Sequence, residues 1–176
     1  RRASLTRVAV IGLGYIGLPT ATVLALRGFD VLGVDVSQRV VDTLKQGKIH
    51  IVEPDLDISV AAAIQSGALQ VSTKPTPADV FIIAVPTPFK DGHKPDLSYV
   101  EAASLAIAPH LVPGNLVILE STSPVGTTQK VSEWLAGARS ELKLPHDHPQ
   151  DADINVAHCP ERVLPGRIMT ELVDND

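Results

Sequence analysis

A glycine-rich turn near the start of the chain limits its fold more than any other feature. Gly12, Gly14 and Gly17 form the pattern GxGxxG in the segment GLGYIG. The apolar run at 7–12 predicts a β-strand before the turn, and apolar residues at helical spacing after it predict a helix that ends at Gly28. A strand that passes through such a turn into a helix is typical of a dinucleotide-binding βαβ unit. The alternative is a glycine-rich turn that binds nothing.

Strand-like and helix-like segments alternate along the rest of the chain. Ser37 is predicted to cap the second helix, and 91–95 (DGHKP) is predicted to be a surface loop. Pro19 falls near the start of the first helix, where its missing N–H has no intrahelical acceptor in any case. Further strands are predicted at 30–35, 69–72, 80–85, 116–119 and 154–158, and further helices at 39–46, 58–66, 97–110 and 127–136.

This alternation predicts an α/β fold of the Rossmann type. Right-handed crossovers between such segments give a doubly wound, mainly parallel sheet with helices on both faces. The composition agrees, because 44% of the residues are hydrophobic and only 3% are aromatic, so the core must consist mainly of Val, Ile, Leu and Ala. A chain of 176 residues is long enough for one such domain, and we expect 1–176 to form a single dinucleotide-binding domain.

Each part of the glycine turn has a separate expected role. Gly12 allows a sharp bend, Gly14 lets the backbone approach a pyrophosphate, and Gly17 lets the helix pack close to the strand. The backbone N–H groups around Tyr15 and Ile16 are expected to face the phosphates from the positive end of the helix dipole.

An acidic residue at the end of the second predicted strand indicates which dinucleotide is bound. Asp35 lies where a carboxylate accepts hydrogen bonds from the adenosine ribose hydroxyls and repels a 2′-phosphate. Arg39 is the competing signal, since an arginine there can hold that phosphate; its other roles are a solvated helix face or stacking on adenine. We give Asp35 more weight, so the sequence predicts NAD rather than NADP.

Charge and cysteine content exclude several other classes of protein. A net charge of −5 gives no electrostatic basis for binding nucleic acid, and no apolar stretch is long enough to span a membrane. Cys159 is the only cysteine, so an internal disulfide is excluded, and the first residues lack a secretory signal; we therefore expect a cytoplasmic protein. His146, His148 and His158 lack zinc-like spacing, and no metal site is expected.

Five short segments together resemble one family, the UDP-glucose/GDP-mannose dehydrogenases. The segments are VIGLGYIGLP at 10–19, VEPDL at 52–56, VPTPF at 85–89, ESTSPVGTT at 120–128 and PER at 160–162. The longer segments IHIVEPDL, AVPTPFK and CPERVLPG are most similar to the branch that acts on UDP-N-acetylmannosamine. The resemblance implies an enzyme of polysaccharide biosynthesis that oxidises the sugar C6 alcohol, through an aldehyde and an enzyme thioester, to the carboxylate with two NAD consumed.

The resemblance also implies roles for three threonines. Thr87 is expected to border the cofactor ribose, Thr128 to line the cofactor site, and Thr122 to help hold the catalytic water. The simpler alternatives are that Thr87 is a turn residue between two prolines and that Thr127 and Thr128 only cap a helix.

The segment CPERV carries the remaining candidates. By resemblance, Glu161 is the base that hydrolyses the thioester, and Arg162 and Val163 contact the sugar nucleotide. A solvated glutamate and a surface ion pair are the alternatives for the first two. Cys159 could supply a thiolate nucleophile, but the family's nucleophile lies in a GGxC segment that this chain lacks, so we predict that Cys159 is a small buried hydrophobe.

The resemblance places much of the machinery outside this chain. The family has a central helical domain, through whose helix we expect the full-length protein to form a homodimer, and a C-terminal UDP-binding domain. We therefore expect these 176 residues to bind NAD weakly and to be inactive alone. The alternatives are a sister dehydrogenase for UDP-glucose, UDP-N-acetylglucosamine or GDP-mannose, and a non-catalytic NAD-binding regulatory module.

Overall fold

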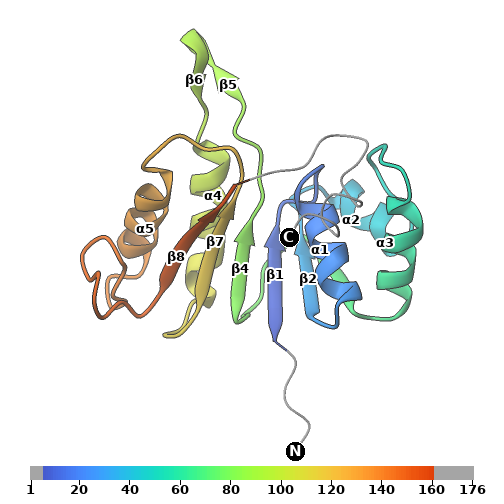
Figure 1. The fold of residues 1–176 in the computed structure, drawn as a ribbon, viewed down its shortest axis with the longest axis horizontal. Coiled ribbons are helices and arrows are strands. Elements are labelled where there is room, and N and C mark those ends of the chain that lie inside the picture. Colours follow the sequence, from blue (N-terminus) through green and yellow to red (C-terminus); the bar gives the residue numbers. More distant parts are fainter. Residues whose placement is uncertain (1–5, 161–176) are drawn as a thin grey trace, which may run out of the picture.

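The computed structural model, which describes residues 6–160, confirms the doubly wound parallel sheet (Figure 1). Six strands lie in the order β3-β2-β1-β4-β7-β8, and each neighbouring pair is parallel. The strands are β1 (Arg7–Ile11), β2 (Asp30–Val34), β3 (Leu69–Ser72), β4 (Val80–Ile83), β7 (Leu116–Glu120) and β8 (Asn155–Cys159). The helices are α1 (Gly17–Leu26), α2 (Gln38–Lys45), α3 (Leu56–Gln65), α4 (Ser98–Ile107) and α5 (Thr127–Ala138).

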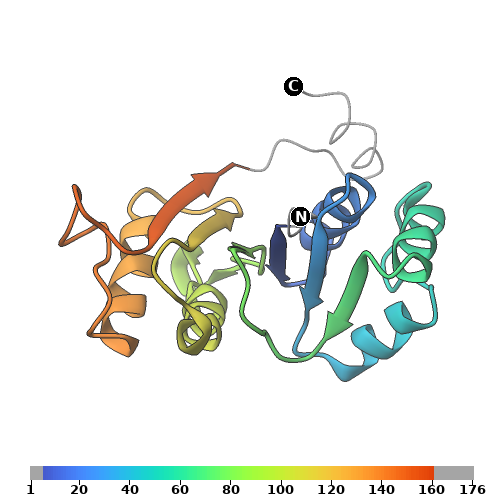
Figure 2. The same cartoon turned by 90° about the horizontal axis from the view of Figure 1, so that it is seen from below.

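The sheet has two hydrophobic layers because successive residues of each strand point to opposite faces. Val8 and Val10 of β1 pack with α1, α2 and α3, whereas Ala9 and Ile11 pack with α4 and α5. Figure 2 shows α1 on one side of the sheet and α4 and α5 on the other. Phe81 is the only aromatic residue among the buried members of the two clusters in the described chain, and Trp134 packs partly buried against one of them. The aliphatic core therefore matches the composition.

The chain direction around the sheet reverses between β1 and β4. From β1 the chain winds outward to β2 and β3, then returns to β4 on the other side of β1 and continues to β7 and β8. Ligands of open α/β sheets bind beyond the carboxyl ends of the strands at such a switch point. This edge of the sheet is therefore the place to look for a site.

Helix boundaries follow the expected local chemistry. The Ser37 side chain accepts a hydrogen bond from the Val40 amide at 3.4 Å, which confirms the predicted cap of α2. Pro19 is buried within the first turn of α1 and does not interrupt it. Every helix between residues 6 and 160 is too short or too polar to cross a lipid bilayer.

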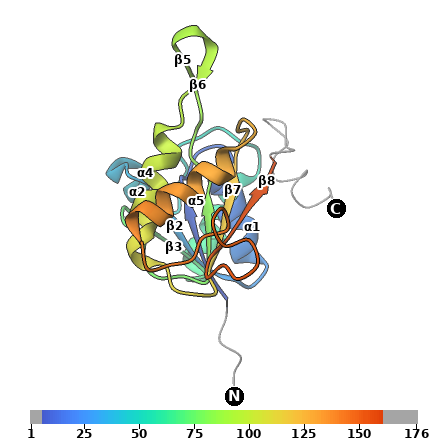
Figure 3. The same cartoon turned by 90° about the vertical axis from the view of Figure 1, so that its left-hand side faces the viewer.

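The region 89–95 differs from the predicted surface loop. It forms a small antiparallel hairpin of β5 (Phe89–Lys90) and β6 (Lys94–Pro95), joined by the 3₁₀ turn η1 (Asp91–His93). The hairpin projects beyond the carboxyl edge of the sheet (Figures 1 and 3). Gly92 and His93 both have positive φ, at 71° and 61°, and this reverses the chain. Strands of two residues have no periodicity that a sequence can reveal.

An aspartate joins the hairpin to α4. Asp96 accepts a hydrogen bond from the Ser98 amide at 2.9 Å. Hydrogen bonds from the side chain and backbone of Ser98 lower the pKa of Asp96, with a smaller contribution from Lys90. The carboxylate is therefore charged at neutral pH where the chain enters the helix. A second 3₁₀ turn, η2 (Ala108–His110), follows α4 directly.

Candidate functional site

Two glycines of the first turn are required by packing within the protein. Gly12 has φ of 98°, and a Cβ at this position would lie 2.8 Å from the Ala84 carbonyl oxygen. A Cβ on Gly17 would lie 1.7 Å from the Gly12 carbonyl oxygen. Real Cβ atoms do not approach other atoms so closely, so Gly12 makes the sharp bend and Gly17 allows α1 to pack against the end of β1, as the sequence indicates.

Packing within the protein does not explain the glycine at position 14. A Cβ added to Gly14 would have no heavy atom within 4 Å. The adjacent residues Tyr15 and Ile16 lead into α1. In its first turn the Leu18 N–H donates to the Gly14 carbonyl oxygen at 3.1 Å and Pro19 has no N–H, so the donors left for a ligand at the helix start are those of Gly17 and of the residues before it. A pyrophosphate that approaches the backbone here gives a reason for the missing side chain and a partner for those donors. The turn therefore fits the phosphates of a dinucleotide.

Asp35 connects the glycine turn to the start of α2. Its Oδ2 accepts a hydrogen bond from the Leu13 amide at 3.1 Å, and its Oδ1 accepts one from the Ser37 amide at 2.9 Å. These bonds fix the carboxylate at the end of β2, and each oxygen keeps a further lone pair for a ribose hydroxyl. Arg39 is exposed on α2. A fixed negative charge at this place favours NAD over NADP.

A hydrogen bond joins the two loops on the other side of the switch point. The Thr87 hydroxyl, which follows β4, donates to the carbonyl oxygen of Thr122, which follows β7, at 2.7 Å. Thr87 is therefore more than a residue of a turn between two prolines. Both threonines follow strands at the carboxyl edge of the sheet, where Ala84 and Val85, just before Thr87, lie against Gly12.

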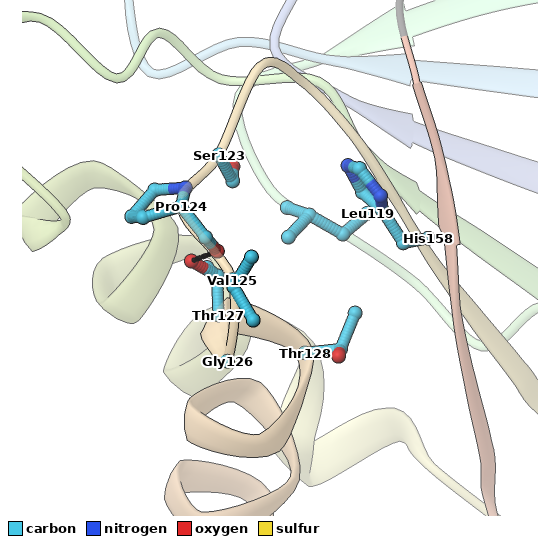
Figure 4. A pocket seen from close by; sticks show the side chains of 8 residues that line it. All are labelled: Leu119, Ser123, Pro124, Val125, Gly126, Thr127, Thr128 and His158. Atoms are coloured by element: carbon cyan, nitrogen blue, oxygen red, sulfur yellow. Dashed lines mark hydrogen bonds between the residues drawn. The ribbon is translucent and has the colours of Figure 1, made fainter.

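The two threonines at the start of α5 have different surroundings. The Thr127 hydroxyl is buried and donates to the Pro124 carbonyl oxygen at 2.7 Å, so it stabilises the turn before the helix. Gly126, in the left-handed conformation, holds the N-cap position, and no side chain caps the helix. Thr128 instead lines a pocket (Figure 4). The alternative that both threonines cap the helix is therefore wrong.

The pocket has a volume of about 150 Å³ and lies between α5, β7 and β8. Figure 4 shows Thr128 and His158 on walls contributed by α5 and β8. Its lining residues are Leu119, Ser123, Pro124, Val125, Gly126, Thr127, Thr128 and His158. The pocket belongs to the same edge of the sheet as the glycine turn, on the other side of the switch point between β1 and β4.

His158 has a structural role that its sequence position did not reveal. Its Nε2 lies 3.0 Å from the Ser121 carbonyl oxygen, and because a carbonyl only accepts, Nε2 carries the proton. The bond ties β8 to the loop after β7. The sequence offers His158 only as a candidate metal ligand. Within residues 6–160, no three His, Cys, Asp or Glu side chains gather as they would around a metal ion.

The prediction for Cys159 is wrong. Its side chain is exposed, not buried. Cys159 ends β8, which pairs with β7 alone among the described strands and has mostly exposed residues. An outermost strand lacks the cover that central strands have on both faces, which the apolar pattern alone does not show. Glu161, Arg162 and Val163 lie outside the described residues.

Fold and site together define the class of protein. A doubly wound sheet with a glycine turn at the switch point and an acid at the end of the second strand is a dinucleotide-binding Rossmann domain. Residues 6–176 match the NAD binding domain of the UDP-glucose/GDP-mannose dehydrogenase family, and the chain belongs to this family. Its cofactor is accordingly NAD.

Individual relatives are similar over nearly the whole chain. An NDP-N-acetyl-D-galactosaminuronic acid dehydrogenase of Ralstonia nicotianae is 62% identical over 96% of this chain, and a UDP-N-acetyl-D-mannosamine dehydrogenase of Campylobacter jejuni is 60% identical over 97%. These alignments cover 40% and 42% of the relatives. The structure of UDP-D-ManNAc dehydrogenase from Pyrococcus horikoshii has a TM-score of 0.88 at 43% identity, over 97% of this chain and 40% of that one. The chain thus spans about two fifths of the length of these relatives.

Proposed function

We propose that the full-length protein oxidises the C6 alcohol of a UDP-linked N-acetylhexosamine, UDP-N-acetyl-D-mannosamine in the first instance, to the uronic acid with two NAD consumed. The observation that carries this proposal is the NAD-type turn, Gly14 beside Asp35, in a chain of the UDP-glucose/GDP-mannose dehydrogenase family. The present chain supplies the NAD site, and central and C-terminal domains of the full-length protein supply the UDP site and the nucleophile.

The cofactor is proposed to extend across both halves of the sheet. Asp35 is proposed to hold the adenosine ribose, and the first N–H groups of α1 the pyrophosphate. Thr87 and Thr128 are proposed to border the nicotinamide half, because both lie at the carboxyl edge beyond the switch point. When bound there, NAD supplies the hydride acceptor for each oxidation.

The remaining steps are assigned to Thr122 and to the segment that follows β8 in the sequence. Thr122, whose carbonyl position is fixed by Thr87, is proposed to help hold the hydrolytic water. Glu161 is proposed to act as the base that takes the proton from this water, and Arg162 and Val163 to contact the sugar nucleotide. Glu161 follows Cys159, the last residue of β8, by two positions in the sequence.

The names of the relatives support a substrate whose sugar carries an acetamido group. Two relatives of 62% and 60% identity have names that specify different N-acetylated sugars. The nucleotide of N-acetyl-D-galactosamine is therefore a second candidate substrate. UDP-glucose and GDP-mannose are less favoured, because the relatives of 62% and 60% identity both have names with an N-acetylated sugar.

Three further features complete the proposal. The 176 residues alone are proposed to bind NAD weakly and to turn over no substrate, since they span two fifths of the relatives. The full-length protein is proposed to be a homodimer through its central helix. It is proposed to work in the cytoplasm, where a chain with a single exposed cysteine has no need of disulfides.

The test is an assay of the full-length protein against a panel of nucleotide sugars. The panel contains UDP-N-acetylmannosamine, UDP-N-acetylgalactosamine, UDP-N-acetylglucosamine, UDP-glucose and GDP-mannose, each with NAD. We expect the highest kcat/KM with UDP-N-acetylmannosamine and two NADH for each uronic acid formed. NAD binding without oxidation of any sugar would instead favour a regulatory NAD-binding module.

A further inference from the structure

A hydrogen bond links two residues that are 100 positions apart in the chain. The Thr20 hydroxyl, near the start of α1, donates to Oε1 of Glu120, the last residue of β7, at 2.5 Å. Both side chains are half-buried. The acceptor is a carboxylate, and such hydroxyl–carboxylate bonds are shorter and stronger than bonds between neutral groups.

The bond spans the switch point of the sheet. β7 is not a neighbour of β1, because β4 lies between them. Ala84, directly after β4, is buried, and its Cβ would lie 3.2 Å from a Cβ on Gly17. Because Gly17 has no side chain and that of Ala84 is small, α1 packs close to the end of β4, and Thr20 on this helix reaches Glu120.

The two ends of the bond belong to different parts of the cofactor site. Thr20 lies one turn after Gly17, on the helix whose first N–H groups face the pyrophosphate. Glu120 directly precedes the loop that carries Thr122 and leads to the pocket lined by Thr128. The bond thus joins the pyrophosphate-binding helix to the nicotinamide-side loop.

We propose that Thr20 and Glu120 are a pair of positioning residues that set the spacing between these two parts of the site. The proposal rests on the NAD site proposed above. A ligand that spans both parts, as NAD does, needs this spacing, whereas a ligand that contacts only the glycine turn and Asp35, as ADP does, does not. The pair should therefore affect NAD affinity selectively.

The test compares NAD and ADP binding to the full-length protein by isothermal titration calorimetry. The variants are Thr20→Val, Glu120→Gln and the double variant. For Thr20→Val we expect a loss of NAD affinity on the order of tenfold, as for other bonds to charged groups, with ADP affinity unchanged. Glu120→Gln keeps an oxygen that can accept from Thr20 but lacks the negative charge, so its loss of NAD affinity should be smaller. The double variant should lose no more than Thr20→Val alone, because without the Thr20 hydroxyl there is no bond left for the charge to strengthen. Thr20→Ser, which keeps the hydroxyl, should bind NAD like the parent protein.

Glu133→Gln provides the matched control. Glu133 accepts a hydrogen bond from Gln129 at 3.0 Å on the exposed face of α5, so the same chemical change is made away from the site. It should leave both affinities unaltered. Equal changes in NAD and ADP affinity, in either direction, would overturn the proposal, since they would indicate a distorted α1 or simple charge repulsion of phosphates. Losses that add up in the double variant, or an unchanged NAD affinity, would also overturn the proposal. If the parent protein bound ADP but not NAD, the cofactor assignment would fail as well.

Discussion

The Thr87 hydroxyl donates to the Thr122 carbonyl oxygen at 2.7 Å, and this bond holds together the loops that follow β4 and β7. Both loops lie where the nicotinamide half of the cofactor is proposed to bind. The sequence alone left Thr87 as either a turn residue or a neighbour of the cofactor. The hydroxyl hydrogen of Thr87 is used in the bond to Thr122. Thr87 therefore affects the cofactor through the shape of both loops and through the lone pairs of its hydroxyl oxygen.

Removal of this hydroxyl should weaken NAD binding more than it weakens the fold. Thr87→Val leaves the Thr122 carbonyl without its donor, and we expect a loss of about 1 kcal/mol in NAD binding free energy, as is typical for one hydrogen bond. Thr87→Ser should bind NAD like the parent protein. Calorimetric titration checks both variants. A Thr87→Val variant with parental NAD affinity would show that the link has no role in the site.

Gly17→Ala should destabilise the domain. The added methyl would lie 1.7 Å from the Gly12 carbonyl oxygen, so α1 must move away from the end of β1. We expect a loss of about 2 kcal/mol or more in unfolding free energy, by analogy with overpacked cores. The matched control is Gly137→Ala in α5, where the methyl meets no atom within 4 Å. That change should stabilise the protein by about 0.5–1 kcal/mol, because alanine is the better helix former. Urea unfolding curves compare the two, and a stable Gly17→Ala protein would contradict the close packing of this turn.

Gly14→Ala should weaken NAD binding and leave the stability of the domain unchanged. A methyl at Gly14 meets no protein atom within 4 Å, so thermal stability should be unchanged. It would occupy the space that the pyrophosphate needs, and NAD affinity should fall by at least about tenfold. Thermal unfolding and NAD titration of the same preparation separate the two effects. Parental NAD affinity in this variant would place the phosphates elsewhere.

Replacement of Asp35 should change the preference between cofactors. Asp35→Asn removes the negative charge at the end of β2 and keeps an oxygen that can accept from Leu13 or Ser37. We expect weaker NAD binding and stronger NADP binding, with the ratio of the two affinities shifted by about tenfold or more. Asp42→Asn on the exposed face of α2 is the control for charge alone. If both variants shift the ratio equally, Asp35 does not contact the ribose.

Local chemistry explains what the sequence could predict. The glycine turn, the Ser37 cap and the apolar strands are each set by a few adjacent residues, so their patterns predicted the doubly wound parallel sheet and the turn that leads into its first helix. Cys159 was assigned wrongly because its burial depends on the position of β8 in the sheet, not on its neighbours in sequence. The Thr20–Glu120 bond joins residues 100 positions apart, and no local pattern marks such a pair.

The central claim, that this chain belongs to an NAD-dependent enzyme with its cofactor at Gly14 and Asp35, is tested most directly by calorimetric titration of the full-length protein with NAD and with NADP. The fixed carboxylate of Asp35 predicts that NAD binds and that it binds more tightly than NADP. Tighter binding of NADP, or no binding of NAD, would contradict the claim.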